Sequence, residues 1–139
     1  MKRLLLILFL LPALIPSGVN GQAATYKVGI IAFYNLENLY DTLNDPLKSD
    51  EEFQPDGSKH YTGEVYKDKL EKLSEVLSQI GTDRTPDGWS VLGCAEIENE
   101  QVLQDLIATP GLVNRKLRIV HYDSPDDRGV DVALIYNPK

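Results

Sequence analysis

Three short stretches of the chain place polar side chains where phosphate chemistry could occur. Asn35 and Glu96 each follow an apolar run of strand length, and Arg128 lies in a turn-rich segment before another apolar run. An amide can orient a phosphate oxygen, and a carboxylate can bind a hard cation such as Mg²⁺. An arginine can hold a phosphate through two parallel hydrogen bonds. These are the residue types of a site for a metal ion and a phosphate group.

Each of the three residues also has a structural explanation. An asparagine after a strand is most often a turn residue, and Asn35 alone is a weak signal. A carboxylate directly after a buried strand, such as Glu96, costs desolvation unless it is paired or binds a metal. Chemistry alone slightly favours an ion pair for Arg128, and its possible partners are Asp126, Asp127 and Asp131.

Glu98 competes with Glu96 as the metal ligand. It lies two residues further on, beside a predicted helix start, where a negative charge suits the helix dipole. We therefore favour Glu96 as the ligand and expect Glu98 to support the first helical turn.

The single cysteine and the two histidines show no catalytic pattern. Cys94 lies in an apolar run, which predicts a small buried side chain, and a single thiol cannot form an intrachain disulfide. His60 and His121 have no spacing to partner ligands, so we expect both to be structural or solvent-facing.

An alternation of strand and helix patterns must position these residues. Apolar and β-branched runs predict strands, and an apolar stripe at helical spacing predicts the longer helix. Residues 41–61 lack such periodicity, which predicts a long surface loop of a kind that is often functional. The predicted strands are 26–33, 89–95, 117–122 and 130–136, and the predicted helices are 64–80 and a second one from the N-cap Asn99 to Ala108. This order predicts an α/β layered domain with a mixed sheet.

Residues 1–21 have the three-part pattern of a secretory signal peptide. Lys2 and Arg3 precede an apolar run, and cleavage is plausible before Gln22. The run is shorter than the about 20 apolar residues that span a bilayer, and no stop-transfer pattern supports the alternative of a retained anchor. We therefore expect an exported protein, periplasmic or extracellular, with its domain over residues 22–139 and no stable membrane anchor after cleavage.

The chain is acidic, with a formal net charge of −7. Non-specific binding of a polyanion depends on neutralising its phosphates, so this charge argues mildly against a structural nucleic-acid binder. It does not argue against a hydrolase, in which a few carboxylates hold a cation that faces the phosphate.

Three segments together resemble the endonuclease/exonuclease/phosphatase superfamily, which includes DNase I-like proteins, and more closely its secreted bacterial branch. They read FYNLENLYD from Phe33, GCAEIEN from Gly93 and DRGVDVALIY from Asp127. The resemblance covers nearly all of residues 22–139, with the segments in the expected order and at sensible spacing. It implies a four-layer α/β sandwich with two facing mixed sheets.

The resemblance also implies a function, namely hydrolysis of a phosphodiester or phosphomonoester by water with the help of Mg²⁺, Mn²⁺ or Ca²⁺. By position, Asn35 matches the family's first-motif asparagine and Glu96 its metal-binding glutamate, while Arg128 matches a substrate contact more loosely. The substrate could be a nucleic acid, a phospholipid head group or a small phosphate ester. No protein partner is predicted.

The sequence departs from the family in one important respect. It contains neither the later Asp-Asn pair, in a Gly-Asp-Phe-Asn type motif, nor the Asp-His pair that acts in catalysis. We therefore expect the N-terminal half of the sandwich, with one sheet face uncovered and prone to association. The alternative to an enzyme is a catalytically inactive fragment that serves as a binding or interaction domain.

Overall fold

The computed structural model describes residues 26–138. The predicted signal peptide, residues 1–21, lies outside the described residues. Within the described range, no helix is long and apolar enough to cross a membrane.

Strands and helices follow one another in the predicted order. The elements are β1 (Ile31–Leu39), α1 (Gly63–Gln79), β2 (Val91–Ile97), α2 (Glu100–Ile107), β3 (Arg118–His121) and β4 (Asp131–Tyr136). Two single-turn 3₁₀ helices, Glu51–Phe53 and Val113–Arg115, lie in the connections. The predicted α/β class is confirmed.

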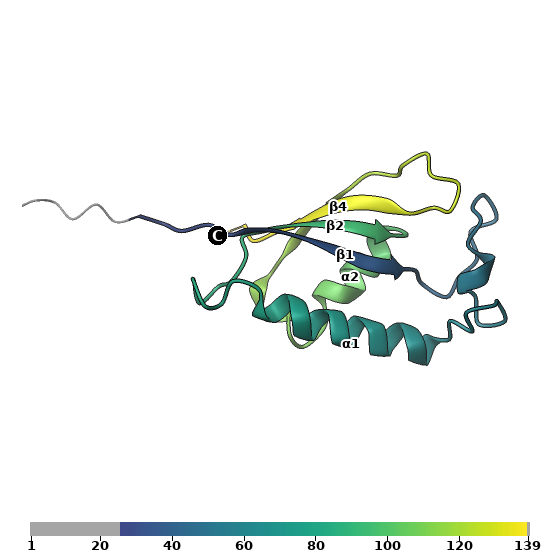
Figure 1. Ribbon diagram of the computed structural model, residues 1–139, viewed down its shortest axis with the longest axis horizontal. Coiled ribbons are helices and arrows are strands. Elements are labelled where there is room, and N and C mark those ends of the chain that lie inside the picture. Colours follow the sequence, from purple (N-terminus) through teal and green to yellow (C-terminus); the bar gives the residue numbers. More distant parts are fainter. Residues whose placement is uncertain (1–25, 139) are drawn as a thin grey trace, which may run out of the picture.

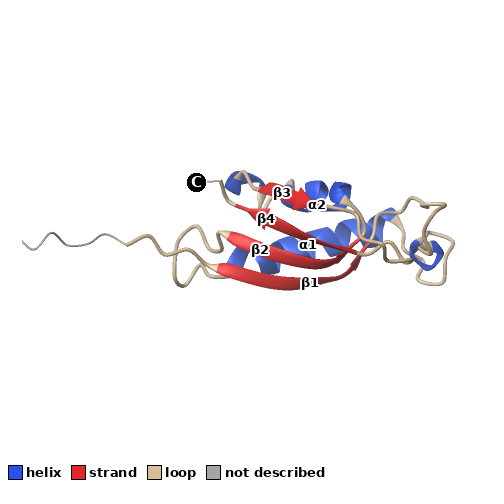
Figure 2. Cartoon of the chain, turned by 90° about the horizontal axis from the view of Figure 1, so that it is seen from above, coloured by secondary structure: helices blue, strands red, loops and turns tan. Residues whose placement is uncertain are grey.

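The strands form one mixed sheet in the order β1-β2-β4-β3 (Figure 2). β1 pairs with β2 in parallel, and β4 pairs antiparallel with both β2 and β3. Parallel neighbours need a crossover connection, and α1 supplies it between β1 and β2. The same pairing brings the carboxyl ends of β1 and β2 to one edge of the sheet.

Both helices pack against the same face of the sheet (Figure 1). α1 begins at Thr62, whose hydroxyl accepts a hydrogen bond from the Val65 N–H at 3.4 Å, and Gly81 follows its end with φ 76°. Asn99 caps α2 as predicted, because its side chain accepts a hydrogen bond from the Val102 N–H at 3.1 Å. These caps satisfy amide groups that a helix start leaves without partners.

The core lies between the sheet and the helices. Trp89 is fully buried, and its indole N–H donates to the Leu77 carbonyl at 2.8 Å, while the Arg115 guanidinium lies 4.2 Å from its ring. Cys94 is also fully buried, and burial raises the pKa of its thiol to about 12. The prediction of a small buried cysteine is confirmed, and a protonated buried thiol is inert as a nucleophile.

The predicted bounds of the first two strands were wrong. Residues 26–30 lie outside the strand, whereas β1 continues through Asn35 to Leu39, and β2 continues through Glu96 to Ile97. Strand bounds depend on hydrogen bonds to a neighbour that is remote in sequence, so local apolar character does not determine them. Asn35 and Glu96 therefore lie within irregular strand ends and not after them.

The opposite face of the sheet has no covering layer among residues 26–138. Its side chains are nevertheless apolar, with Phe33 69% exposed, Val132 66% and Leu134 46%. The described chain thus forms one sheet and one helix layer, and the apolar face is open, as the sequence led us to expect. Apolar surface of this kind favours association.

The open face generates a first prediction. Replacing Val132 and Leu134 together by threonine puts a β-branched side chain at both positions, which suits a strand, and removes much of the exposed apolar area. We expect concentration-dependent association, measured by light scattering, to fall several-fold. We expect the free energy of unfolding to change by less than about 1 kcal/mol, because both side chains are exposed.

The matched control is the double substitution of Val65 and Val76 by threonine. Both valines are exposed, but they lie on α1. Equal loss of association in the two variants would contradict a role for the open sheet face.

Candidate functional site

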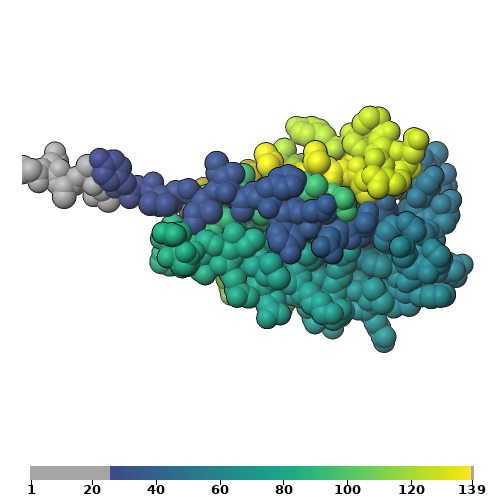
Figure 3. Space-filling view, in the orientation of Figure 1, coloured from purple at the N-terminus to yellow at the C-terminus, as the bar shows by residue number. Residues whose placement is uncertain are grey.

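The candidate site lies at the edge of the sheet to which β1 and β2 point (Figure 1). The segment that follows β1 and the connection between β3 and β4 meet at this end of the molecule (Figure 3). Their contacts include Ser49 N–H to the Asp127 carbonyl at 2.8 Å and the Tyr40 hydroxyl to the Arg128 carbonyl at 2.8 Å. Two segments far apart in sequence thus form one wall around the strand ends.

Asn35 lies on the open side of the sheet. Its Cα pairs with that of Ala95, and its side chain is exposed, in alternation with the buried Leu36. The side-chain oxygen accepts a hydrogen bond from the Glu37 N–H at 2.7 Å. This bond to the backbone two residues on is typical of an asparagine in a turn. It leaves the amide nitrogen of Asn35 available as a donor.

Glu96 is the extra residue of an irregularity in β2. The register to β4 shifts between Ala95 and Ile97, and Glu96 has φ 59°, in the left-handed region. A non-glycine residue in such a conformation costs roughly 1–3 kcal/mol, and such residues cluster at functional sites. Ala95 pairs with Asn35, so Glu96 is the next residue along the neighbouring strand.

Glu37 and Asn38 form a second strained stretch, at the end of β1. Their φ values are 55° and 59°. Lys69 of α1 reaches this turn and donates from its ammonium group to both carbonyls, with 3.0 Å to that of Asn38. The lysine thereby holds the strained backbone next to Asn35.

The sequence analysis did not identify Lys69 as a residue of the site. Burial lowers the pKa of Lys69, and the negative charges of Glu37 and Glu96 oppose this shift. The ammonium group is thus close enough to Glu96 for the two charges to interact. No spacing in the sequence indicates this contact, because it depends on how α1 packs under β1.

Arg128 is exposed and forms an ion pair with Asp126. Its Nε and Nη2 atoms donate to the two carboxylate oxygens, each at 3.2 Å. The pairing lowers the pKa of Asp126 and raises that of Arg128, to which Glu96 contributes as well. The ion-pair alternative is therefore confirmed, and Arg128 also lies within electrostatic range of Glu96.

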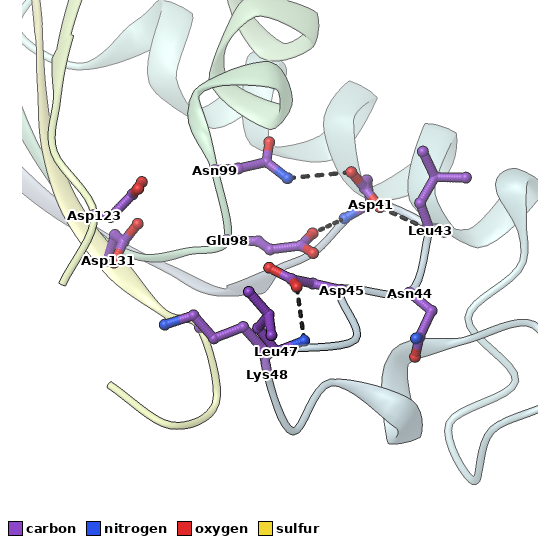
Figure 4. A pocket seen from close by; sticks show the side chains of 11 residues that line it. Asp41, Leu43, Asn44, Asp45, Leu47, Lys48, Glu98, Asn99, Asp123 and Asp131 are labelled. Atoms are coloured by element: carbon purple, nitrogen blue, oxygen red, sulfur yellow. Dashed lines mark hydrogen bonds between the residues drawn. The ribbon is translucent and has the colours of Figure 1, made fainter. Parts of the chain in front are cut away.

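An acidic pocket of about 360 Å³ lies beside these residues (Figure 4). Glu98 lines it and accepts a hydrogen bond from the Asp41 N–H at 2.7 Å. Burial, with added repulsion from neighbouring aspartates, raises the pKa of Glu98 to about 7. The carboxylates that line the pocket are Asp41, Asp45, Glu98, Asp123 and Asp131.

The role expected for Glu98 was wrong. Asn99 is the N-cap, so Glu98 precedes the helix and Glu100 is the acidic residue of the first turn. Glu98 instead ties β2 to the segment after β1. Asp41 and Glu98 are far apart in the sequence, so no local sequence pattern predicts their contact.

The donor set around the strand ends suits a hard divalent cation. Glu96 supplies carboxylate oxygens and Asn35 an amide oxygen, the ligand type that Mg²⁺ prefers, often with only one or two carboxylates. The amide oxygen would have to release its bond to Glu37 N–H in order to bind directly.

Comparison with known families gives one informative match. A family model described as "Endonuclease/Exonuclease/phosphatase family" matches residues 30–139, a range that includes Asn35, Glu96 and Arg128. Neither the curated proteins nor the solved structures give a match to the chain.

The contact of Lys69 generates a second prediction. Substitution by methionine keeps the aliphatic stem but removes both hydrogen bonds to the strained turn. We expect a loss of about 1 kcal/mol in the free energy of unfolding, measured with urea. We also expect the amide NMR signals of Glu37 and Asn38 to shift, because the turn loses its anchor.

The control is the substitution of Lys72 by methionine on the same helix. Lys72 is exposed and pairs with Asp68, so its loss should have little effect. Unchanged signals at the β1 turn in the Lys69 variant would exclude the positioning role.

Proposed function

The chain belongs to the endonuclease/exonuclease/phosphatase family, and on this premise we propose that its strand-end site is that of a metal-dependent phosphoesterase. Membership supports a phosphoesterase- or nuclease-like function in general. The observation that carries the finer proposal is the pairing of Asn35 with Ala95, the residue that precedes Glu96 on the neighbouring strand. Asn35 and Glu96 each lie in or beside backbone held in the left-handed region.

The side chains have separate roles in this proposal. Glu96 holds the divalent ion, which when bound would polarise a phosphoryl oxygen as a Lewis acid. Asn35 orients a phosphate oxygen through its amide nitrogen. Lys69 keeps the β1 turn in place and adds positive charge near the site, which favours an anionic substrate.

Arg128 is the proposed substrate contact. Its two donor atoms are occupied by Asp126 in an exposed ion pair, a type of interaction that adds little to stability. A phosphate group can replace the carboxylate because it offers the same two-oxygen geometry. In the absence of phosphate, the Asp126 carboxylate occupies its place and keeps the guanidinium group oriented.

The site and the open sheet face share one side of the molecule. Asn35 continues the alternating row of Ile31 and Phe33. In the proposed four-layer sandwich, the second sheet packs on this apolar row and supplies the residues that activate water. The alternative function is that of a binding domain, which binds metal and phosphate but does not turn over substrate.

We further propose that the protein is exported after cleavage before Gln22. The apolar run that follows Lys2 and Arg3 supports this location. Mass spectrometry of the N-terminus of the exported product tests it, and an intact Met1 in that product would contradict it. The proposed substrate class is a phosphate ester, whether nucleic acid, phospholipid head group or small molecule.

Substitution of Glu96 by glutamine generates a third prediction. Loss of the carboxylate charge should weaken Mg²⁺ or Mn²⁺ binding at this site by roughly tenfold or more, as measured by calorimetric titration of the chain. Hydrolysis of bis(p-nitrophenyl) phosphate, assayed in parallel, separates an active chain from a binding domain.

Glu100→Gln serves as the matched control, because Glu100 is exposed at the start of α2. Equal metal affinity in the Glu96 variant and the wild type would remove Glu96 from the site. If the wild type hydrolyses the substrate and the Glu96 variant does so equally well, Glu96 has no role in catalysis.

Arg128 and Asp126 generate a fourth prediction, with effects of opposite sign. Arg128→Lys loses the two-pronged geometry and should weaken binding of inorganic phosphate several-fold. Asp126→Asn removes the competing charge and should strengthen it. NMR titration with phosphate measures both, and identical affinities in the two variants would reject the phosphate contact.

A further inference from the structure

A second group of metal-ligating side chains lies at the junction of β3, β4 and their connection. His121 ends β3, Asp123 follows it, and Asp131 begins β4. One ligand atom from each residue lies within 4.8 Å of the others. The function proposed above uses none of these three residues.

The group faces the helix side of the sheet. Asp131 is buried and alternates with the exposed Val132, in the same row as Ala133 and Ile135 of the core. Asn35, by contrast, lies on the open side. The two sets of residues therefore use opposite faces of the same sheet.

We propose that His121, Asp123 and Asp131 form a site for a transition-metal ion of the zinc class. A nitrogen ligand combined with two carboxylate oxygens suits Zn²⁺ better than Mg²⁺ or Ca²⁺, which bind oxygen ligands almost exclusively. The expectation that His121 has no ligand role came from spacing along the chain. The sheet instead brings its partner Asp131 beside it from the neighbouring strand.

Two of the three ligand atoms are already paired with each other. His121 Nε2 and Asp131 Oδ2 form a hydrogen bond at 2.7 Å, and their side chains are only 6% and 4% exposed. A zinc-class ion would replace this hydrogen bond, and tetrahedral ligands with bonds of about 2.1 Å lie about 3.4 Å apart, so the two side chains would have to separate by less than about 1 Å. Asp123 is exposed at the rim, so its carboxylate can rotate to complete the group.

The remaining Asp131 oxygen is held by the loop. Asp131 Oδ1 accepts a hydrogen bond from the Ser124 N–H at 2.8 Å, and the Ser124 hydroxyl donates to the Val130 carbonyl at 3.0 Å. Outer hydrogen bonds of this kind orient metal-binding carboxylates. The connection between β3 and β4 is thus folded around the proposed ligand.

The surroundings provide an independent reason for a cation. Asp123 and Asp131 line the acidic pocket together with three further carboxylates, which face them across it (Figure 4). Lys48 is the one basic residue among those that line this pocket, and its ammonium group is bonded to the Asp126 carbonyl at 2.9 Å. Several carboxylates around one cavity create a negative potential that attracts a divalent cation.

Calorimetric titration of the chain with Zn²⁺, after treatment with EDTA and dialysis, tests the proposal. We expect one bound Zn²⁺ per chain and at least a roughly tenfold loss of affinity in Asp123→Asn and in His121→Gln. Co²⁺ gives a second measurement, because its visible absorption should change when the imidazole ligand is removed.

Two variants serve as controls. Asp127→Asn removes an exposed carboxylate of the same loop, and Glu96→Gln removes the ligand proposed for the phosphoesterase site; both should leave Zn²⁺ affinity unchanged. Because Asp123 is exposed, its variant should fold normally even if His121→Gln destabilises the chain.

The proposal is overturned if the wild type binds no Zn²⁺ or if Asp123→Asn binds it as tightly as the wild type. Loss of Zn²⁺ binding through Glu96→Gln would also overturn it. Zn²⁺ affinity is measured without phosphate hydrolysis. The zinc site can therefore be correct even if the proposed phosphoesterase function is wrong.

Discussion

The parallel pairing of β1 with β2 is the constraint on which the rest of the structure depends. Parallel strands require a crossover, and α1 provides it while covering one face of the sheet. The pairing also brings the carboxyl ends of both strands to one edge, where Asn35 pairs with Ala95 and Glu96 follows. The crossover helix then supplies Lys69, which holds the strained end of β1. The pairing of β1 with β2 thus determines where the helix layer lies, at which end of the sheet Asn35 and Glu96 lie, and that Lys69 lies near them.

The two faces of this edge differ in chemistry. On the helix side, the loops form an acidic pocket, which is lined by Asp131 of the buried His121–Asp131 pair. On the open side, Asn35 adjoins apolar side chains such as Phe33. Carboxylates concentrate where a cation can neutralise them, and apolar residues concentrate where another layer can cover them. This end of the sheet therefore has an acidic pocket on the helix side and apolar side chains on the open side.

Much of the fold could be predicted because its signals are local. Helix periodicity, the Asn99 cap and apolar runs identified the elements and their order, and the buried Cys94 followed from its neighbours. The site was predictable only in part. Asn35 pairs with Ala95, the residue before Glu96, but the strand bounds were wrong and Glu98 contacts Asp41 instead of supporting a helix turn. These errors share one cause, since each involves a partner remote in sequence.

By itself, the sequence determined the helices and strands and their order, the burial of Cys94, and the family that the chain resembles. Periodicity, capping and composition carry that information within a few residues of each position. Only the tertiary structure decided that Lys69 anchors the β1 turn, that Glu98 accepts a hydrogen bond from the Asp41 N–H, and that His121 meets Asp131. These contacts arise from strand order and helix packing, which place remote segments together. Side-chain chemistry at such contacts depends on distance in space, and the linear sequence does not specify that distance.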